Sequence, residues 1–451
     1  MGEGDGDRPS VARKPVDWAL RPFADVRQGE GQTALIMTAN IFVVLVAYYV
    51  IKTVREPLIL TTGGAELKAY AAAAQAGLLL AAVPVYSFFA ARSSTRRLVF
   101  GLTLFFVLCI ELFFVGWSMK LPMLGFAFYV WVGIFNVAII AQFWSFANDV
   151  YTVQKGERLF PLIAIGATVG APVGAFIAKQ LFDSGLSPAA LMQVAAALLV
   201  LHLYLYRATL SRPDGLPQGD WMRERERQPI FGGFARVLRS RYLTEIAVLL
   251  VLLNLVNSTG EYLLSRYAET QADAALAAAL QRDPGLEVGP FMDQFFGSFY
   301  GGFFFWVNIA SLLIQALMVS RLVKYFGIAG VLFALPLVAL GTYGFVALGF
   351  GFALFRGFKT AENATDYSAM NTARALLWLP TSHQEKFQAK QATDTFFVRF
   401  GDVIAAVFVY LGTQHWALSP EGFARTNVLF IGLWFLVAVW VYRRYRNKAV
   451  S

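Results

Sequence analysis

Residues 34–60 read ALIMTANIFVVLVAYYVIKTVREPLIL and combine a long apolar run with three charges. Residues 34–51 carry no charge, and about 20 apolar residues are enough to cross the hydrocarbon core of a bilayer as a helix. Lys52, Arg55 and Glu56 follow at the end of this run. A charge inside the membrane costs about 2.5–3.5 kcal/mol, and such residues usually serve binding or pairing. This stretch therefore predicts a membrane helix whose polar end has a function.

The composition extends this prediction to the whole chain. Of the 451 residues, 57% are hydrophobic and 15% are charged, whereas soluble domains have about 25% charged residues. The first residues are polar and lack the basic-then-apolar pattern of a signal peptide, so we expect no cleaved leader. Cys109 is the single cysteine, which excludes an intrachain disulfide. The three histidines lie far apart, and we expect neither a metal site nor a cofactor.

Twelve apolar runs are long enough to span a membrane, which predicts an all-α polytopic protein. Most of the 38 basic residues lie in alternate loops and in both tails, which predicts that both termini are cytoplasmic. Two six-helix halves with a long linker are the organisation of major-facilitator-like transporters, whose site lies between the halves. The predicted spans are 34–60, 66–91, 98–118, 122–149, 158–182, 187–207, 243–268, 293–320, 327–348, 351–378, 389–413 and 426–442. The predicted domains are a tail (1–33), a first half (34–207), a linker (208–242), a second half (243–442) and a second tail (443–451).

Charged residues within three spans predict a site for an anion. The helical rise places Lys52, Arg55, Arg266, Arg356 and Lys359 at a similar depth in the outer half of the membrane. Acids neutralise only part of this charge, and Arg and Lys are the usual ligands of phosphate groups. We therefore expect a small anionic, phosphorylated substrate, although salt bridges at a gate or snorkelling side chains would also explain the charges. The predicted substrate-binding residues are Lys52, Arg55, Asn257, Arg356, Lys359, Asn363 and Asp366.

Other charged residues suggest gating or ion coupling. Two charged turns, one in each half, predict an inner gate that closes by salt bridges, although ordinary positive-inside charge explains them equally well. A proton-coupled transporter would need a carboxylate with a raised pKa, and Glu261, Glu362 and Asp366 are the candidates. The predicted gating and coupling residues are Glu56, Asp149, Arg158, Glu261, Arg266, Glu362, Arg374, Arg399 and Asp402.

Two further motifs predict packing. Gly166, Gly170 and Gly174 have the four-residue spacing that lets membrane helices approach closely. The segment lacks the Gly-Lys-Ser/Thr ending of a phosphate loop. The aromatic residues of FYGGFFFW, residues 299–306, are expected to pack or to face lipid, and stacking on a substrate ring is the less favoured alternative.

Three segments resemble the ATP/ADP translocases of plastids and obligate intracellular bacteria. They are VIKTVREPLILTTGG (50–64), FWSFANDVYTVQKGERLFPLIAIGATVGAPVGAF (143–176) and ENATDYSAMNTARALLWLPTSHQEKFQAKQATDTFFVRFGD (362–402). The resemblance implies a twelve-helix, major-facilitator-like antiporter that exchanges ATP for ADP plus phosphate. It also implies a basic first-span residue, which Arg55 provides. The chain departs from the family in the fourth span, which has no glutamate, at Asn257 in place of a glutamate, and at Asp402 in place of a lysine.

Together, these observations predict a secondary transporter in a bacterial inner membrane that works by alternating access. Its expected partners are a small anionic substrate, with ATP and ADP implied by the resemblance, and the lipid bilayer. We expect a monomer that binds no nucleic acid and is not an enzyme, because no catalytic constellation is present. The alternatives are exchange or proton-coupled transport of another organic anion or amphiphile, and a scaffold without transport activity.

Overall fold

The computed structural model describes residues 15–20, 22, 24–212, 215, 232–350, 352–382, 385 and 389–450. All regular elements in these ranges are helical. Eight continuous helical stretches are long and apolar enough to cross a membrane. Two of them, Gly31–Ala82 and Val288–Ala347, each include one predicted span and most of a second, and the predicted spans 351–378 and 389–413 are not among the eight. The number of twelve spans therefore stays a prediction.

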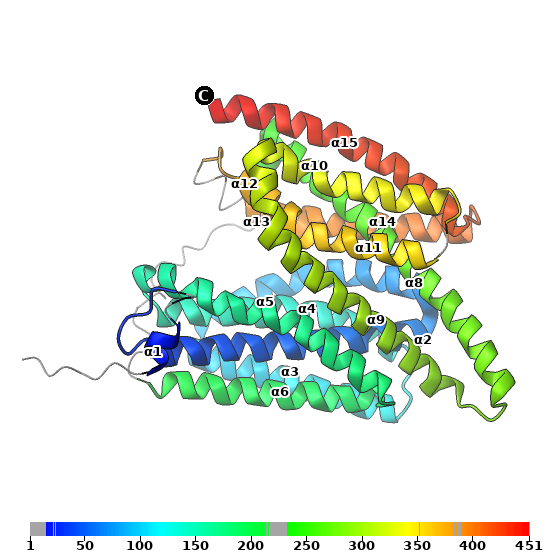
Figure 1. Ribbon diagram of the computed structural model, residues 1–451, viewed down its shortest axis with the longest axis horizontal. Helices are drawn as coiled ribbons and strands as arrows, with labels where there is room; N and C mark the ends of the chain where they lie inside the picture. Colours follow the sequence, from blue (N-terminus) through cyan, green and yellow to red (C-terminus); the bar gives the residue numbers. More distant parts are fainter. Residues whose placement is uncertain are drawn as a thin grey trace, which may run out of the picture.

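The helices form two bundles that lie side by side (Figure 1). About half of the predicted linker falls on residues outside the described ranges, and the domain limits stay predictions. The first bundle contains α1 (Pro15–Leu20), α2 (Gly31–Arg92), α3 (Thr95–Ser118), α4 (Leu124–Val150), α5 (Val153–Asp183) and α6 (Pro188–Leu210). The second contains α7 (Gly232–Arg239), α8 (Arg241–Arg282), α9 (Val288–Ile314), η3 (Gln315–Val319), α10 (Ser320–Ala347), α11 (Phe352–Thr365), η4 (Asp366–Met370), α12 (Asn371–Leu377), α13 (Lys390–Ala392), η6 (Thr393–Phe397), α14 (Val398–Gln414) and α15 (Pro420–Val450).

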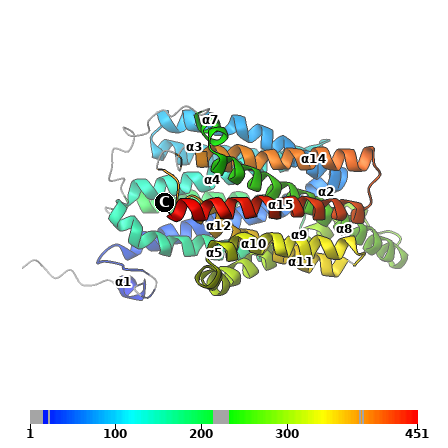
Figure 2. The ribbon, with the colours of Figure 1, turned by 90° about the horizontal axis from the view of Figure 1, so that it is seen from above.

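Both views place α1 and the C-terminal end of α15 at the same end of the molecule (Figures 1 and 2). We call this the terminal end and the opposite one the far end. The turns at residues 93–94 and 151–152 belong to the terminal end, because the chain alternates between the two ends from helix to helix. The turns at 119–123 and 184–187 belong to the far end.

A backbone break divides α2 at the far end. Gly63 and Gly64 have non-helical backbone angles, and Gly64 has a φ of 70°, which favours glycine. The break falls between the predicted spans 34–60 and 66–91. The amide of Ala65 begins the second part of α2 and donates to Oε1 of Glu269 in α8, at 2.6 Å. A carboxylate from the second bundle therefore caps a helix of the first bundle.

The glycines of α5 allow close packing against the first part of α2. A Cβ atom added to Gly166 would lie 2.3 Å from the carbonyl oxygen of Thr38, and one added to Gly170 would lie 2.7 Å from that of Phe42. The corresponding atom at Gly174 would lie 2.8 Å from the Cα of Val46. These neighbours are backbone atoms that cannot rotate away, so the predicted packing role of the motif is confirmed.

We predict that Gly166→Ala lowers the thermal unfolding midpoint in detergent by several degrees, because the added methyl group forces α5 away from α2. Overpacking of this kind costs about 1–3 kcal/mol. Fluorescence-detected size-exclusion chromatography after heating measures the effect. Gly101→Ala in α3 is the matched control, since a Cβ atom there meets nothing within 4 Å. Equal midpoints for the two variants would contradict the packing role.

Candidate substrate site

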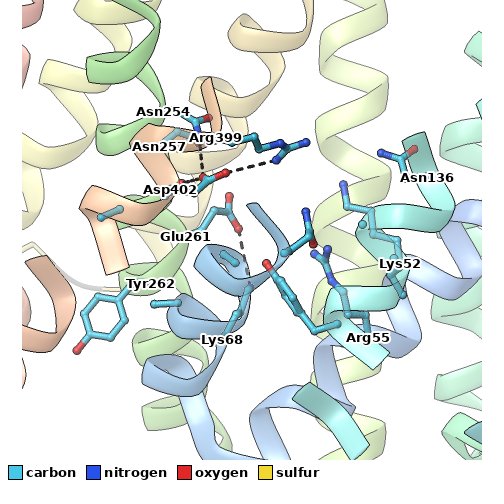
Figure 3. Close-up of a pocket in the computed structure, with 18 of the residues that line it drawn as sticks. Lys52, Arg55, Lys68, Asn136, Asn254, Asn257, Glu261, Tyr262, Arg399 and Asp402 are labelled. Carbon is cyan, nitrogen blue, oxygen red and sulfur yellow. Dashed lines mark hydrogen bonds and ion pairs between the residues drawn. The ribbon is translucent and has the colours of Figure 1, made fainter. Parts of the chain in front are cut away.

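A cavity of about 240 Å³ lies where the two bundles meet. It is formed by α2 and α4 of the first bundle and by α8, α9, α11, η4 and α14 of the second (Figure 3). The predicted site residues that line it are Lys52, Arg55, Asn257, Glu261, Asn363, Arg399 and Asp402. Phe304, from the predicted aromatic segment, also lines it. The polar and aromatic lining residues that sequence analysis did not single out are Tyr48, Lys68, Gln75, Tyr129, Asn136, Asn254, Ser258, Tyr262 and Tyr367.

Lys52 brings a positive charge to this cavity. Its ammonium lies 4.2 Å from the ring centre of Phe304, 5.2 Å from that of Tyr49 and 6.0 Å from that of Tyr367. The residue is 9% exposed, and among the described residues no carboxylate forms an ion pair with it. Cation–π contacts stabilise the ammonium only in part, so its charge remains available to an anion. Phe304, from the predicted aromatic segment, thus contributes to the cavity.

The carboxylate of Glu56 lies between two cations of α2, Arg55 before the backbone break and Lys68 after it. Its Oε1 is 2.5 Å from Nη2 of Arg55, and its Oε2 is 2.7 Å from Nζ of Lys68. The side chain of Glu56 is fully buried, so the carboxylate needs both partners to offset its lost hydration. The guanidinium of Arg55 also lies 4.2 Å from the ring centre of Tyr129. The break at Gly63 and Gly64 thus brings the two parts of α2 together around one carboxylate.

Lys68 also connects the two bundles. Its Nζ donates to Ser265 Oγ at 3.0 Å and to Tyr300 OH at 3.3 Å, and lies 4.0 Å from Oε2 of Glu261. Sequence analysis did not place Lys68 in the site, yet the residue is buried and lines the cavity. Gly63 and Gly64, just before Lys68, could have indicated this position in the sequence, because a tight backbone break places the next helical turn deep in the protein.

Lys359 reaches the cavity through another residue. Its Nζ lies 3.1 Å from Oε1 of Glu362 and donates to Oδ1 of Asn257 at 2.9 Å. Tyr343 donates its hydroxyl to the same Oε1 of Glu362 at 3.0 Å. Lys359 is fully buried, and Asn257 lies between it and the cavity. The contacts therefore suit Lys359 to position Asn257 rather than to touch a solute in this conformation.

Three predicted residues lie apart from the cavity. The guanidinium of Arg356 lies 4.5 Å from the ring centre of Phe299 and lines a separate hollow of about 500 Å³. Arg266 pairs with Glu269 at 3.2 Å. Asp366 begins η4 and does not line the cavity. The five cations predicted to cluster are therefore separated. Lys52 and Arg55 line the cavity, and Lys359 pairs with Glu362. Arg266 pairs with Glu269, and Arg356 lines the separate hollow.

Asp149 and Arg158, two predicted gating residues of the terminal end, have partners in their own bundle. The hydroxyl of Thr95 donates to Oδ2 of Asp149, and Nη2 of Arg158 lies 3.0 Å from Oε1 of Glu30. Arg374 lies in the last turn of α12. A gate formed by salt bridges between the two halves at this end stays a prediction.

Contacts between the bundles are present at the far end. In addition to the cap on Ala65, Nε2 of Gln414 donates to Oε2 of Glu66 at 3.3 Å. Gln294 donates to the carbonyl oxygen of Asp183 at the same distance. These bonds and those of Lys68 join the first and second bundles between the cavity and the far end.

Comparison with known sequences identifies relatives. Residues 124–445 match the sequence model of the family described as TLC ATP/ADP transporter. The chain is 22% identical over 366 residues to ADP,ATP carrier protein 1 of Chlamydia pneumoniae, covering 70% of this chain and 65% of that protein. It is 20% identical over 352 residues to the protein of the same name from Chlamydia trachomatis serovar D, covering 68% and 61%. The chain thus spans less than two thirds of the length of these relatives.

Comparison with solved structures shows the fold. The nucleoside transporter NupG aligns with a TM-score of 0.63 at 12% identity, covering 91% of this chain and 98% of that one. A bacterial homologue of the iron transporter ferroportin, in its inward-facing state, aligns with a TM-score of 0.62 at 14% identity, covering 92% and 98%. The predicted all-α, major-facilitator-like fold is confirmed. The chain belongs to the TLC ATP/ADP transporter family.

Proposed function

We propose that this transporter exchanges ATP and ADP, or closely similar phosphorylated anions, across a bacterial inner membrane by alternating access. The observation that carries the proposal is the buried ammonium of Lys52, which lines a cavity between the bundles and forms no ion pair with a described carboxylate. Arg55 lies one helical turn away and also lines the cavity. The names of the Chlamydia relatives, ADP,ATP carrier protein 1, support the same substrates.

The charge balance around the cavity favours an anion. We count the charged residues that line it, together with those that form ion pairs with the lining residues or their partners. Their formal charges leave one excess positive charge, because Lys52 is the cation without a carboxylate. The cations are Lys52, Arg55, Lys68, Lys359 and Arg399, and the acids are Glu56, Glu261, Glu362 and Asp402.

This balance supports exchange rather than one-way transport. When the cavity is empty, a reorienting carrier must enclose an uncompensated charge, which is costly in a medium of low dielectric constant. A bound anion removes this cost from either side of the membrane. We therefore expect the loaded carrier to reorient faster than the empty one, which makes uptake depend on a counter-substrate.

The volume of the cavity and the contacts at the far end indicate from which side a solute enters. Small-molecule sites usually have volumes of about 300–1,000 Å³, so a cavity of about 240 Å³ is small for a nucleotide. The bundles must separate further to admit one, and the far end is held by the cap on Ala65 and the bonds of Lys68. We propose that entry occurs from the terminal end and that this end is cytoplasmic, in agreement with its basic residues.

A smaller organic anion, with or without a coupled proton, is the second candidate. The size of the cavity favours it, and Glu261 is a lining carboxylate whose side chain is 28% exposed. Proton coupling predicts uptake driven by a pH gradient without internal substrate. Exchange predicts that uptake requires internal substrate.

We predict that Lys52→Gln raises the half-saturating ATP concentration by about 10- to 100-fold, as expected for the loss of one charge-assisted interaction worth about 1.5–3 kcal/mol. Uptake of labelled ATP into proteoliposomes that contain ADP measures it. Arg356→Gln should change this concentration less than twofold, because Arg356 lies in the separate hollow. Lys120→Gln, an exposed change at the far end, is the control for insertion. An equal effect at Lys52 and Arg356 would contradict the assignment of the cavity.

We further predict that Lys68→Met loosens the far end, because it removes the bonds to Ser265, Tyr300 and Glu56 together. Spin labels at Glu66→Cys and Gln414→Cys, in a Cys109→Ser background, report the distance across the contact. Pulsed electron paramagnetic resonance should then show a new population at longer distance. Lys120→Met should leave the distribution unchanged. A distribution in Lys68→Met that equals the parent's would exclude Lys68 from far-end closure.

A further inference from the structure

The separate hollow of about 500 Å³ lies between the bundles near the far end, apart from the cavity that Lys52 lines. The last residue of α5 borders it from the first bundle, and α8, α9 and α11 border it from the second. Helix α9 packs against both α5 and α11. Because α5 ends here and α9 and α11 begin here, the hollow lies at the level where lipid headgroups meet the hydrocarbon core.

Arg356 gives this hollow an uncompensated positive charge. Its guanidinium lies against the ring of Phe299, and among the described residues no carboxylate forms an ion pair with it. Asp183 also lines the hollow, but its carboxylate pairs with Lys179 one helical turn earlier. The guanidinium is always charged and carries five donors, so the hollow is suited to an anion that accepts several hydrogen bonds.

Lys179 and Arg356 approach each other across α9. A Cβ atom added to Gly302 would lie 3.3 Å from Nη2 of Arg356 and 3.5 Å from Cε of Lys179. The absence of a side chain at Gly302 thus leaves room for two cations, one from each bundle. A phosphate group is the usual partner of such Arg and Lys side chains.

The seam between α5 and α9 continues from the hollow towards the middle of the membrane. Phe176 precedes Asp183 by seven residues on one face of α5, and Phe305 follows Ser298 by seven on one face of α9. The two rings contact each other with centres 5.6 Å apart, about 10 Å deeper than the hollow by the helical rise. Phe176 is 43% exposed, and the neighbouring Trp306 is 57% exposed. An anionic group in the hollow can therefore carry an apolar chain that lies over these rings.

Uncharged polar groups complete the lining. Gln271, Gln294 and Ser298 face the same hollow, and Nε2 of Gln294 donates to the carbonyl oxygen of Asp183. Amide and hydroxyl groups both donate and accept, so they suit hydroxyl groups better than a second charge. A headgroup with one negative charge and free hydroxyls matches this set.

We propose that the hollow binds the headgroup of an anionic glycerophospholipid, with its phosphodiester on Arg356 and an acyl chain over Phe176 and Phe305. The phosphate is the chemistry that the cations recognise, and the apolar seam selects a lipid over a soluble phosphate ester. The lipid would contact both bundles near the far end. This site goes beyond the proposed function and does not depend on which solute the central cavity transports.

The test measures the thermal unfolding midpoint of the purified full-length protein in a neutral detergent, with and without added lipid. Dioleoyl phosphatidylglycerol should raise the midpoint by about 3 °C or more, because a ligand that binds only the folded state stabilises it. Dioleoyl phosphatidylcholine should give less than half of this shift, since its choline group cancels the charge. Glycerol 3-phosphate in excess should give little shift, because it lacks the acyl chains.

Arg356→Gln should remove most of the shift that phosphatidylglycerol produces. Each variant is compared with itself without lipid, so a change in its basal stability does not affect the result. Arg425→Gln is the matched control, because Arg425 is an exposed cation near the start of α15 at the same end and does not line the hollow. It should retain the full shift.

Three results would overturn the proposal. Equal shifts with phosphatidylglycerol and phosphatidylcholine would show that the protein gains only from added lipid in general. Equal loss of the shift in Arg356→Gln and Arg425→Gln would show attraction to surface charge without a site. A shift with glycerol 3-phosphate as large as that with phosphatidylglycerol would assign the hollow to a soluble phosphate ester instead of a lipid.

Discussion

The carboxylate of Glu56, held between Arg55 and Lys68, is the constraint on which the rest of the site depends. A fully buried carboxylate is stable only if its partners stay in place, and here they come from two parts of α2 on either side of a backbone break. The break must therefore be tight, which explains why glycines occupy positions 63 and 64. Because Lys68 also donates to Ser265 and Tyr300, the same carboxylate indirectly fixes how the second bundle approaches the first.

The arrangement separates the tasks of the two bundles. The first bundle supplies cations from a single helix, and close contacts at Gly166, Gly170 and Gly174 hold the first part of that helix against α5. The second supplies the carboxylates Glu261 and Asp402 together with the cation Arg399, and short bonds from Asn254 and Ser258 hold Asp402. Lys52 differs from the other cations of the site, because aromatic rings rather than a carboxylate surround its ammonium group. A site with one positive charge that no described carboxylate pairs with, at the interface of two bundles, is suited to bind an anion.

The sequence predicted the fold well because apolar length and basic loops are strong signals in membrane proteins. The first predicted boundary, between residues 60 and 66, brackets the break at Gly63 and Gly64, and the predicted span 98–118 agrees with α3. The site was predicted less completely. The helical rise placed Arg356 and Lys359 at a similar depth, but it does not reveal that Lys359 pairs with Glu362 or that Arg356 lies against the ring of Phe299. Lys68 was missed because a charge at the start of an apolar run resembles an interfacial residue.

The cap on Ala65 has a mechanical consequence. The first turn of a membrane helix needs an acceptor for its free amides, and here Glu269 of the other bundle provides one. Separating the bundles at the far end withdraws that acceptor, so water must replace it before the turn is satisfied again. If the far end opens during transport, as proposed, hydration of a helix terminus becomes part of that step, and its barrier includes the wetting of a single peptide group.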